Sequence, residues 1–253
     1  MIFDADTHMS PYRNFPEAIS APELNDKLAA AGVDKAVCWL LPQGVDDVSE
    51  SNRYIYDNCR QMPRFVPFGW ANVMEGEDKA VRDAVTCLDE YGFRGVKING
   101  AQNYYPIDSL AAMHVCEEIA KRKGVIAFHI GFDEPLMTSP FRAATVASAF
   151  PETPILMIHM GGASATEENA SRTVIDVAKL CPNMYLIGSA IQAECVKTAI
   201  DELGAHRVMF GSDVPFRDPM ACIRDYDEML QGVDAQTRNQ VMYQTAYDLF
   251  CGT

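Results

Sequence analysis

The chain has 253 residues, 35 acidic against 21 basic, and a formal net charge of −14. The hydrophobic fraction of 48% and charged fraction of 22% are those of a globular protein, and the length can bury a sizeable core. No run of Lys and Arg occurs, so nucleic acid and anionic membranes are excluded as expected partners. No continuous apolar stretch reaches about 18 residues, so no membrane span is expected.

Cysteine usage indicates the cellular compartment. The eight cysteines are scattered and none forms a C-x-x-C pair. The N-terminus lacks a basic region followed by an apolar run, so no signal peptide is expected. We therefore expect reduced, mostly buried thiols and a cytoplasmic location.

The first half of the chain alternates short apolar runs with segments of helical spacing. The apolar runs predict buried strands at residues 1–3, 33–41, 64–73 and 93–98, the third interrupted by Pro67. Helical spacing, ended by Gly or Pro, predicts helices at residues 24–31, 51–62, 77–91 and 109–123.

The same alternation continues through the second half. Strands are predicted at residues 125–130, 154–159, 184–187 and 207–210. Helices are predicted at residues 139–150, 167–180, 190–203, 220–230 and 236–250.

These elements form eight strand–helix units. The strands are continuous apolar runs rather than alternating ones, which is typical of parallel strands covered on both faces. Eight such units in about 250 residues match a (β/α)8 TIM barrel. We expect one domain over residues 1–253, since no linker or composition break interrupts the chain. A doubly wound open sheet is the alternative, but no glycine-rich nucleotide loop supports it.

Polar residues follow several of the predicted strands. In a TIM barrel the functional side chains lie at the carboxyl ends of the strands. Asp6 and His8 are two residues apart, so on a strand they point to the same side. Later strands end in Lys97, His129, His159 and Asp213.

Each of these residues alone has an ordinary structural explanation. A histidine after an apolar run is usually a hydrogen-bonded core or loop residue, and Asp213 could cap the segment that follows it. Five carboxylate and imidazole side chains at one end of a predicted barrel are harder to explain as five unrelated structural residues. They are the ligand types that zinc or manganese uses, so the pattern favours a metal site.

The chain resembles the amidohydrolase superfamily, in particular the amidohydrolase-related branch that includes aminocarboxymuconate-semialdehyde decarboxylase. The matching pieces run in the family's order across nearly the whole chain. They are FDADTH at residues 3–8, GFRGVKI at 92–98, AFH at 127–129, LMIHMGG at 156–162 and VMFGSDVP at 208–215.

The resemblance implies a distorted barrel that binds one divalent metal ion, with a second ion less expected. It implies that Asp6, His8, His129 and Asp213 are the metal ligands, with Asp213 also moving the proton of a metal-bound water. His159 would contact the substrate or the reacting group.

Two positions depart from the family pattern. Relatives most commonly have two histidines on the first strand, whereas the first position here is Asp6. Zinc is the first expected metal, and the added carboxylate makes manganese or magnesium alternatives. Lys97 lies where binuclear relatives carry a metal-bridging lysine. A structural or substrate-binding ammonium is the preferred interpretation here.

Two reactions fit these residues. The first expectation is a hydrolase that cleaves an amide, lactone or ester bond of a small, carboxylate-bearing molecule with metal-activated water. The alternative is a decarboxylase of a small aromatic or dienoic acid, in which Asp213 protonates carbon. A barrel that binds a ligand without turnover is a more remote alternative.

The expected substrate-binding residues are Lys97, His159 and Tyr104. Lys97 would offer a positive charge to a substrate carboxylate. Tyr104 lies in the segment after the fourth strand, where it could line the mouth of the barrel or simply pack there. A homodimer is compatible with the sequence, which contains no feature that fixes the oligomeric state.

Overall fold

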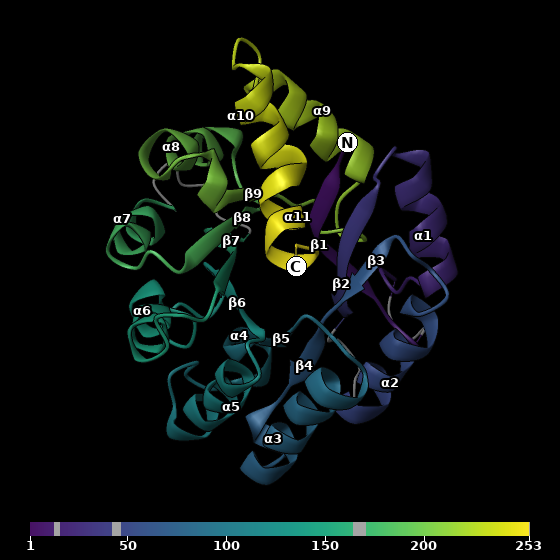
Figure 1. Cartoon of the computed structure of the whole chain (residues 1–253), viewed down its shortest axis with the longest axis vertical. Coiled ribbons are helices and arrows are strands. Elements are labelled where there is room, and N and C mark those ends of the chain that lie inside the picture. Colours follow the sequence, from purple (N-terminus) through teal and green to yellow (C-terminus); the bar gives the residue numbers. More distant parts are fainter. Residues whose placement is uncertain (13–15, 42–46, 164–170, 253) are drawn as a thin grey trace.

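The computed structural model describes residues 1–12, 16–41, 47–163 and 171–252, and in this part of the chain parallel strands form a barrel surrounded by helices (Figure 1). The strands are β1 (Phe3–Met9), β2 (Lys35–Leu40), β3 (Phe65–Pro67), β4 (Gly69–Ala71), β5 (Gly95–Ile98), β6 (Val125–Gly131), β7 (Ile155–Ala163), β8 (Met184–Gly188) and β9 (Val208–Phe210). β1–β2–β3 and β4 through β9 are each hydrogen-bonded in chain order. Only Phe68 separates β3 from β4, so these two short strands occupy one strand position. The described strands therefore fill the eight strand positions expected of a TIM barrel.

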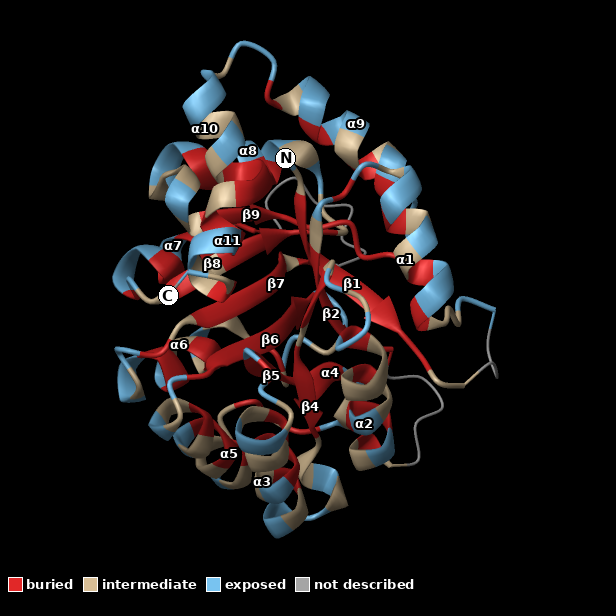
Figure 2. Cartoon of the chain, turned by 45° about the vertical axis from the view of Figure 1, so that its right-hand side comes forward, coloured by how far each residue is buried: buried red, intermediate tan, exposed pale blue. Residues whose placement is uncertain are grey.

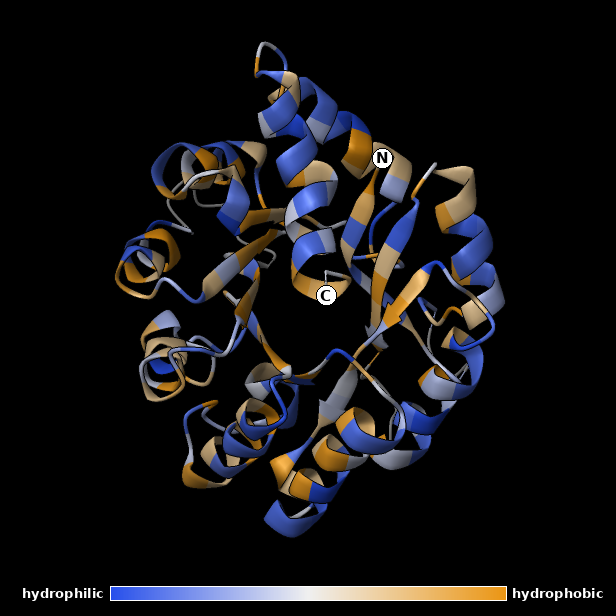
Figure 3. Ribbon diagram, viewed as in Figure 1, coloured by the Kyte–Doolittle hydropathy of each residue, from blue (hydrophilic) through white to orange (hydrophobic). Residues whose placement is uncertain are grey.

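Helices cover the outside of this barrel. They are α1 (Ala21–Ala30), α2 (Val48–Cys59), α3 (Glu77–Val85), α4 (Gly100–Asn103), α5 (Leu110–Lys121), α6 (Pro140–Ala149), α7 (Arg172–Leu180), α8 (Ala193–Leu203), α9 (Pro219–Met229), α10 (Ala235–Asn239) and α11 (Thr245–Phe250). The strands are almost entirely buried, whereas the helices expose their outer faces (Figure 2). Those outer faces carry the hydrophilic residues (Figure 3). The helices therefore cover the sheet with one apolar face each, as predicted for strands buried on both sides.

The last helix closes the amino-terminal end of the barrel. α11 lies over the barrel axis in Figure 1. The ring of Phe250 lies 5.8 Å from that of Phe3 and 5.4 Å from that of Phe68, centre to centre. The Arg94 guanidinium donates to the carbonyl of Leu249, which ties this helix to the end of the sheet. The polar residues that the sequence singled out lie at the opposite end of the barrel, at the carboxyl ends of the strands.

The barrel closes between β1 and the segment that follows β9. The Asp213 N–H donates to the Asp6 carbonyl at 2.9 Å, and the His8 N–H donates to the Val214 carbonyl at 2.8 Å. The side chain of Asp4 reinforces this closure. Its Oδ1 accepts from the backbone N–H of Ser212 at 2.9 Å and of Asp6 at 3.1 Å. The two segments with predicted metal ligands are therefore neighbours.

Some predicted boundaries are wrong. The first strand does not end near residue 3 but continues to Met9, so Asp6 and His8 lie within it. The strand continues through these polar residues because the neighbouring segments give them hydrogen-bond partners. The short helix α4 was not predicted. The predicted helix over residues 167–180 begins at Arg172 in the structure, and its residues 167–170 lie outside the described part of the chain.

All eight cysteines are free thiols and seven are buried, as predicted. Within the described residues, no helix combines the length and the apolar character needed to cross a bilayer.

Asp4 provides a test of the barrel closure. Asp4→Ala should lower the free energy of unfolding by about 2–4 kcal/mol, because each buried N–H left without a partner costs about 1–3 kcal/mol. Asp4→Asn keeps the acceptor oxygen and should stay within about 1 kcal/mol of the wild type near pH 4, where the folded wild-type side chain is neutral as well. Urea denaturation of the metal-free proteins measures both changes. Equal stability of the alanine and asparagine variants would contradict this role.

The pH dependence of the free energy of unfolding provides a second comparison of the wild type with Asp4→Asn. Burial raises the pKa of Asp4 to about 7, above its unfolded value of 3.8, even though Ser212 and Asp6 donate to it. The folded protein therefore loses stability as pH rises from about 4 to about 7, because the unfolded chain releases this proton while folded Asp4 still holds it. Asparagine does not titrate, so Asp4→Asn should gain stability relative to the wild type as pH rises from about 4 to about 7, with little further change above that.

Candidate metal centre

A cavity of about 260 Å³ lies at the carboxyl ends of the strands. His8, Lys97, His129, His159 and Asp213 all line it. Asp6 does not line the cavity but is fully buried against these residues. The structure thus brings together the residues that the sequence singled out at strand ends, apart from Tyr104.

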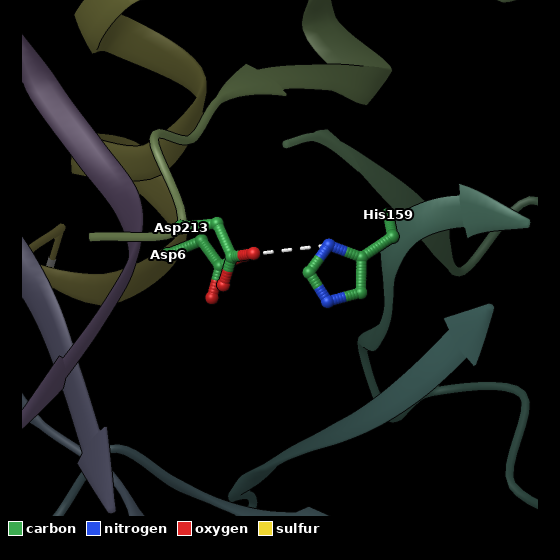
Figure 4. Close-up of side chains that lie close together, drawn as sticks. All are labelled: Asp6, His159 and Asp213. Carbon is green, nitrogen blue, oxygen red and sulfur yellow. Dashed lines mark ion pairs between the residues drawn. The ribbon is translucent and has the colours of Figure 1, made fainter. Parts of the chain in front are cut away.

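Two carboxylates and an imidazole converge at this end of the barrel. Asp6, Asp213 and His159 each have a possible ligand atom, and these atoms all lie within 4.8 Å of one another (Figure 4). Asp6 comes from β1, Asp213 from the segment after β9, and His159 from β7. Their proximity follows directly from the closure of β1 against the residues after β9.

His8 faces the same point. Its Nδ1 lies 2.9 Å from the Leu40 carbonyl, an acceptor, which leaves Nε2 directed at the two carboxylates. Nε2 is 3.4 Å from Asp6 Oδ1 and 3.3 Å from Asp213 Oδ1. Two ligand atoms bound tetrahedrally about 2.0–2.1 Å from one ion lie about 3.3–3.4 Å apart, so His8 Nε2 is spaced from each carboxylate as a second ligand of the same cation would be.

The charges in this cluster also favour a cation. Burial and the charge of Lys97 oppose protonation of His8, but hydrogen bonds to Asp213 and Asp6 outweigh them and raise its pKa. Burial alone would raise the pKa of Asp6, yet the hydrogen bond with His8 and the charges of His159, His8 and Lys97 hold it below its usual range. The carboxylates therefore need a positive charge between them, which a proton on His8 or a metal ion can supply.

Asp6 is held by two donors that the sequence analysis missed. The Trp39 indole N–H donates to Oδ1 at 2.9 Å, and the Ser189 hydroxyl donates to Oδ2 at 2.5 Å. Trp39 belongs to β2, and Ser189 follows β8. Ser189 had a detectable signal, since it is a polar residue directly after a predicted strand. Trp39 had none, because it lies inside an apolar run.

His159 is buried between Asp6 and His129. Burial lowers the pKa of His159 to about 4, although the charges of Asp213 and Asp6 oppose this shift. It is therefore neutral at pH 7. Its Nδ1 is 2.9 Å from the Ser189 hydroxyl oxygen and 3.7 Å from Asp6 Oδ2. Its ring packs edge-on against the ring of His129, at 4.8 Å between centres.

His129, the predicted strand-five ligand, has a different neighbour. Its Nε2 lies 2.9 Å from Asp133 Oδ1. Asp133 is on the segment after β6 and its side chain is half exposed. A carboxylate that accepts from a histidine in this way commonly orients a metal-ligating imidazole. Whether His129 binds metal through its other nitrogen stays a prediction.

Lys97 supplies the one ammonium among the described residues that line the cavity. Its side chain is almost fully buried, with Nζ 4.5 Å from the centre of the Trp39 ring and 5.3 Å from that of Trp70. No carboxylate among the described residues lies within 4.0 Å of Nζ. Burial lowers the pKa of Lys97, while the charges of Asp6, Asp213 and Asp133 act in the opposite direction.

Tyr104 lies elsewhere. Its side chain is 67% exposed and does not line the cavity, whereas the adjacent Tyr105 is buried. Residues of the same segment take the place that the sequence analysis gave to Tyr104. Asn99 and Gln102 line the cavity and hydrogen-bond each other at 2.6 Å. α4 turns the chain at this point, so Gln102 faces inward and Tyr104 outward.

Two site residues have strained backbones. His159 and Asp213 have φ angles of 67° and 62°, in the left-handed region that non-glycine residues seldom adopt. Each such residue costs on the order of 1–3 kcal/mol, and such strain concentrates at functional sites. The fold therefore holds these side chains toward the cavity at a conformational cost.

The family profile described as "Amidohydrolase" matches residues 6–251. This chain belongs to the amidohydrolase family. No curated protein sequence matches the chain. The match begins at Asp6 and runs through Asp213, so every residue of the candidate centre lies in the amidohydrolase region.

Solved structures with the same fold include two kinds of decarboxylase. One is 5-carboxyvanillate decarboxylase from Sphingomonas paucimobilis, at 15% identity and a TM-score of 0.79, with 100% of this chain and 99% of that chain covered. Another is 2,6-dihydroxybenzoate decarboxylase from Rhizobium, at 16% identity and a TM-score of 0.75, with 99% and 98% covered. A dihydroxybenzoic acid decarboxylase from Polaromonas, with bound manganese and 2-nitroresorcinol, gives 16% identity and a TM-score of 0.75, with 99% and 96% covered.

The metal-binding prediction for this amidohydrolase can be tested at His8. His8→Ala should weaken binding of Mn²⁺ and Zn²⁺ by more than the roughly 10–100-fold that loss of an outer partner costs, because a ligand itself is lost. Metal content after dialysis against a defined free-metal buffer measures the effect. His114→Ala, at an exposed histidine of α5, is the matched control and should bind like the wild type. Unchanged metal content in His8→Ala would exclude this site.

Proposed function

We propose that this protein is a metal-dependent decarboxylase of a small aromatic carboxylic acid. This proposal reverses the order of the sequence analysis, which placed hydrolysis first. Neighbours in fold carry out decarboxylation, and structures of them hold 2,6-dihydroxybenzoate or manganese with an aromatic inhibitor. The observation in this chain that carries the proposal is the Lys97 ammonium, which lines a small cavity beside the candidate metal ligands and has no carboxylate within 4.0 Å among the described residues.

The size and lining of the cavity suit such a substrate. Its volume of about 260 Å³ is slightly below that of common ligand pockets, which measure about 300–1,000 Å³, so only a small molecule fits. Phe216 and the His129 ring give it flat aromatic walls, and Lys97 gives it one cationic group. A single ring with a carboxylate matches these three features. A long or bulky acyl compound with a separate leaving group does not.

A metal ion held by Asp6, His8 and Asp213, with His129 as the predicted fourth ligand, would attract a substrate carboxylate and stabilise negative charge. The two carboxylates make a hard oxygen-rich donor set, so manganese is the first metal to test and zinc the second.

Individual residues of the chain would then have separate roles in decarboxylation. Lys97 binds the substrate carboxylate by its charge. Asp213, whose side chain is 12% exposed and can exchange protons with solvent, gives a proton to the ring carbon as its bond to the carboxylate breaks. Carbon dioxide leaves, the carbon–hydrogen bond replaces the carbon–carboxyl bond, and Asp213 recovers a proton from solvent. Neutral His159 can hydrogen-bond a polar group of the substrate.

We also propose a cytoplasmic location, supported by eight free thiols in an unpaired pattern.

A substrate screen of the metal-loaded protein tests the function. Hydroxybenzoates, other aromatic or dienoic acids, lactones and amides should be tested with Mn²⁺ and with Zn²⁺, and the reactions followed for both carbon dioxide release and hydrolysis. We expect carbon dioxide from at least one aromatic acid. Asp213→Asn should reduce that rate by about 10²–10⁴-fold, the usual contribution of a positioned proton donor, while the exposed Asp218→Asn should not. Hydrolysis without carbon dioxide release would replace this function with the hydrolase alternative.

Lys97→Met tests how the substrate is bound. Methionine keeps the apolar length of the side chain but removes its charge, and a charge-assisted hydrogen bond contributes about 1.5–3 kcal/mol. The KM for the carboxylic acid found in the screen should therefore rise by about 10–150-fold. Lys197→Met, at an exposed position of α8, is the control for loss of one positive charge. An unchanged KM in Lys97→Met would show that Lys97 does not bind the carboxylate.

A further inference from the structure

Ser189 joins two residues of the site that come from strands that are not neighbours in the barrel. It directly follows β8 and is 1% exposed. Its hydroxyl donates to Asp6 Oδ2 at 2.5 Å, and its Oγ is 2.9 Å from His159 Nδ1. One hydroxyl group therefore contacts both the candidate metal ligand of β1 and the neutral histidine of β7.

The contact depends on a glycine. A Cβ atom added at Gly211 would lie 2.9 Å from the Cβ of Asp6 and 3.2 Å from the Cβ of Ser189. Any side chain at position 211 would therefore push Asp6 and Ser189 apart. The strand end of β9 has no side chain at the place where these two residues meet.

The direction of the hydrogen bonds fixes the tautomer of His159. A serine hydroxyl has one hydrogen, and the ionised Asp6 carboxylate can only accept it. The Ser189 oxygen is then an acceptor toward His159 Nδ1, and the Ser189 carbonyl, 3.3 Å from the same nitrogen, is a second acceptor. Nδ1 must therefore carry the hydrogen of the neutral ring, and Nε2 carries a lone pair.

We propose that Ser189 is a positioning residue, which fixes the tautomer of His159 and the orientation of Asp6. The inference rests on the proposed function for its catalytic consequence, but not for the hydrogen-bond pattern itself. With Oδ2 held by Ser189, Asp6 presents Oδ1 to His8 Nε2 at 3.4 Å, the side on which a cation fits.

The tautomer also defines what His159 can do. Figure 4 shows one ring nitrogen of His159 directed at the carboxylates of Asp6 and Asp213, and the other nitrogen one ring carbon away from it, with no contact to these carboxylates drawn. That second nitrogen is Nε2, and as a lone-pair acceptor it can bind an O–H or N–H of the substrate but cannot donate to a carbonyl oxygen. Ser189 would thus select acids that carry a hydrogen-bond donor close to the reacting carbon.

Steady-state kinetics test the effect of Ser189 on catalysis. Ser189→Ala should lower kcat by about 10–100-fold at saturating metal, the usual cost of losing a residue that orients a metal ligand. Ser189→Thr keeps the hydroxyl and should recover most of this loss. Ser51→Ala is the matched control, since Ser51 is also a fully buried serine but lies on α2 away from the cavity. Equal impairment of the alanine and threonine variants would overturn the role of the hydroxyl.

Histidine nitrogen NMR tests the tautomer without any turnover. In ¹⁵N-histidine-labelled protein loaded with Zn²⁺, with His159→Gln used for assignment, we expect the wild-type ring to carry its hydrogen on Nδ1. In Ser189→Ala the resonance should shift toward the other tautomer or a mixture. Wild-type His159 with hydrogen on Nε2, or with Nδ1 bound to zinc, would overturn the proposal. This spectrum is read in the wild type even if Ser189→Ala does not fold. A failed substrate screen would refute the decarboxylase function and leave this result unaffected.

Discussion

The hydrogen bonds that close the barrel between β1 and the residues after β9 determine the rest of the site. They place Asp6 of β1 beside Asp213, although more than two hundred positions separate these residues in the sequence. Without that closure the two carboxylates would be ordinary polar residues at two strand ends. With it they share a single buried space with His8 and His159. The metal-binding geometry is therefore a consequence of barrel topology rather than of any local motif.

Closure also brings together charges that would be unfavourable alone. Asp6, His8 and Lys97 are almost completely buried. An isolated ionised group in such surroundings either shifts its pKa toward the neutral form or strongly destabilises the folded protein. Here each charge has an opposite charge or a donor nearby, and the shifts in pKa follow from these neighbours as well as from burial. The carboxylates outnumber the fixed positive charges at the point where they meet. A cation is the natural complement to this cluster.

Much of this could be predicted from the sequence because barrel residues follow two simple rules. Apolar runs identified the strands, and polar residues after those runs identified His129, His159 and Asp213 as neighbours in space. Strand limits were predicted less well, since β1 continues through Asp6 and His8 once their partners are in place. Tyr104 is exposed and does not line the cavity, because the short helix α4 turns the chain at this point. Trp39 contacts Asp6 of the neighbouring strand, and Asp133 contacts His129 from the segment after β6; no periodicity encodes either side-chain contact.

Asp6 gives two of the missed residues, Trp39 and Ser189, a common explanation. A histidine at this position, bound to metal through one nitrogen, would need only one further partner. A carboxylate offers two oxygens with about four acceptor sites, so its orientation is undetermined unless donors restrain it. Trp39 and Ser189 restrain one oxygen each, and both donors are neutral. They fix the orientation of Asp6 without neutralising its charge. A metal site with this carboxylate carries more negative charge than a site with two histidines on the first strand, and this charge favours a harder metal ion.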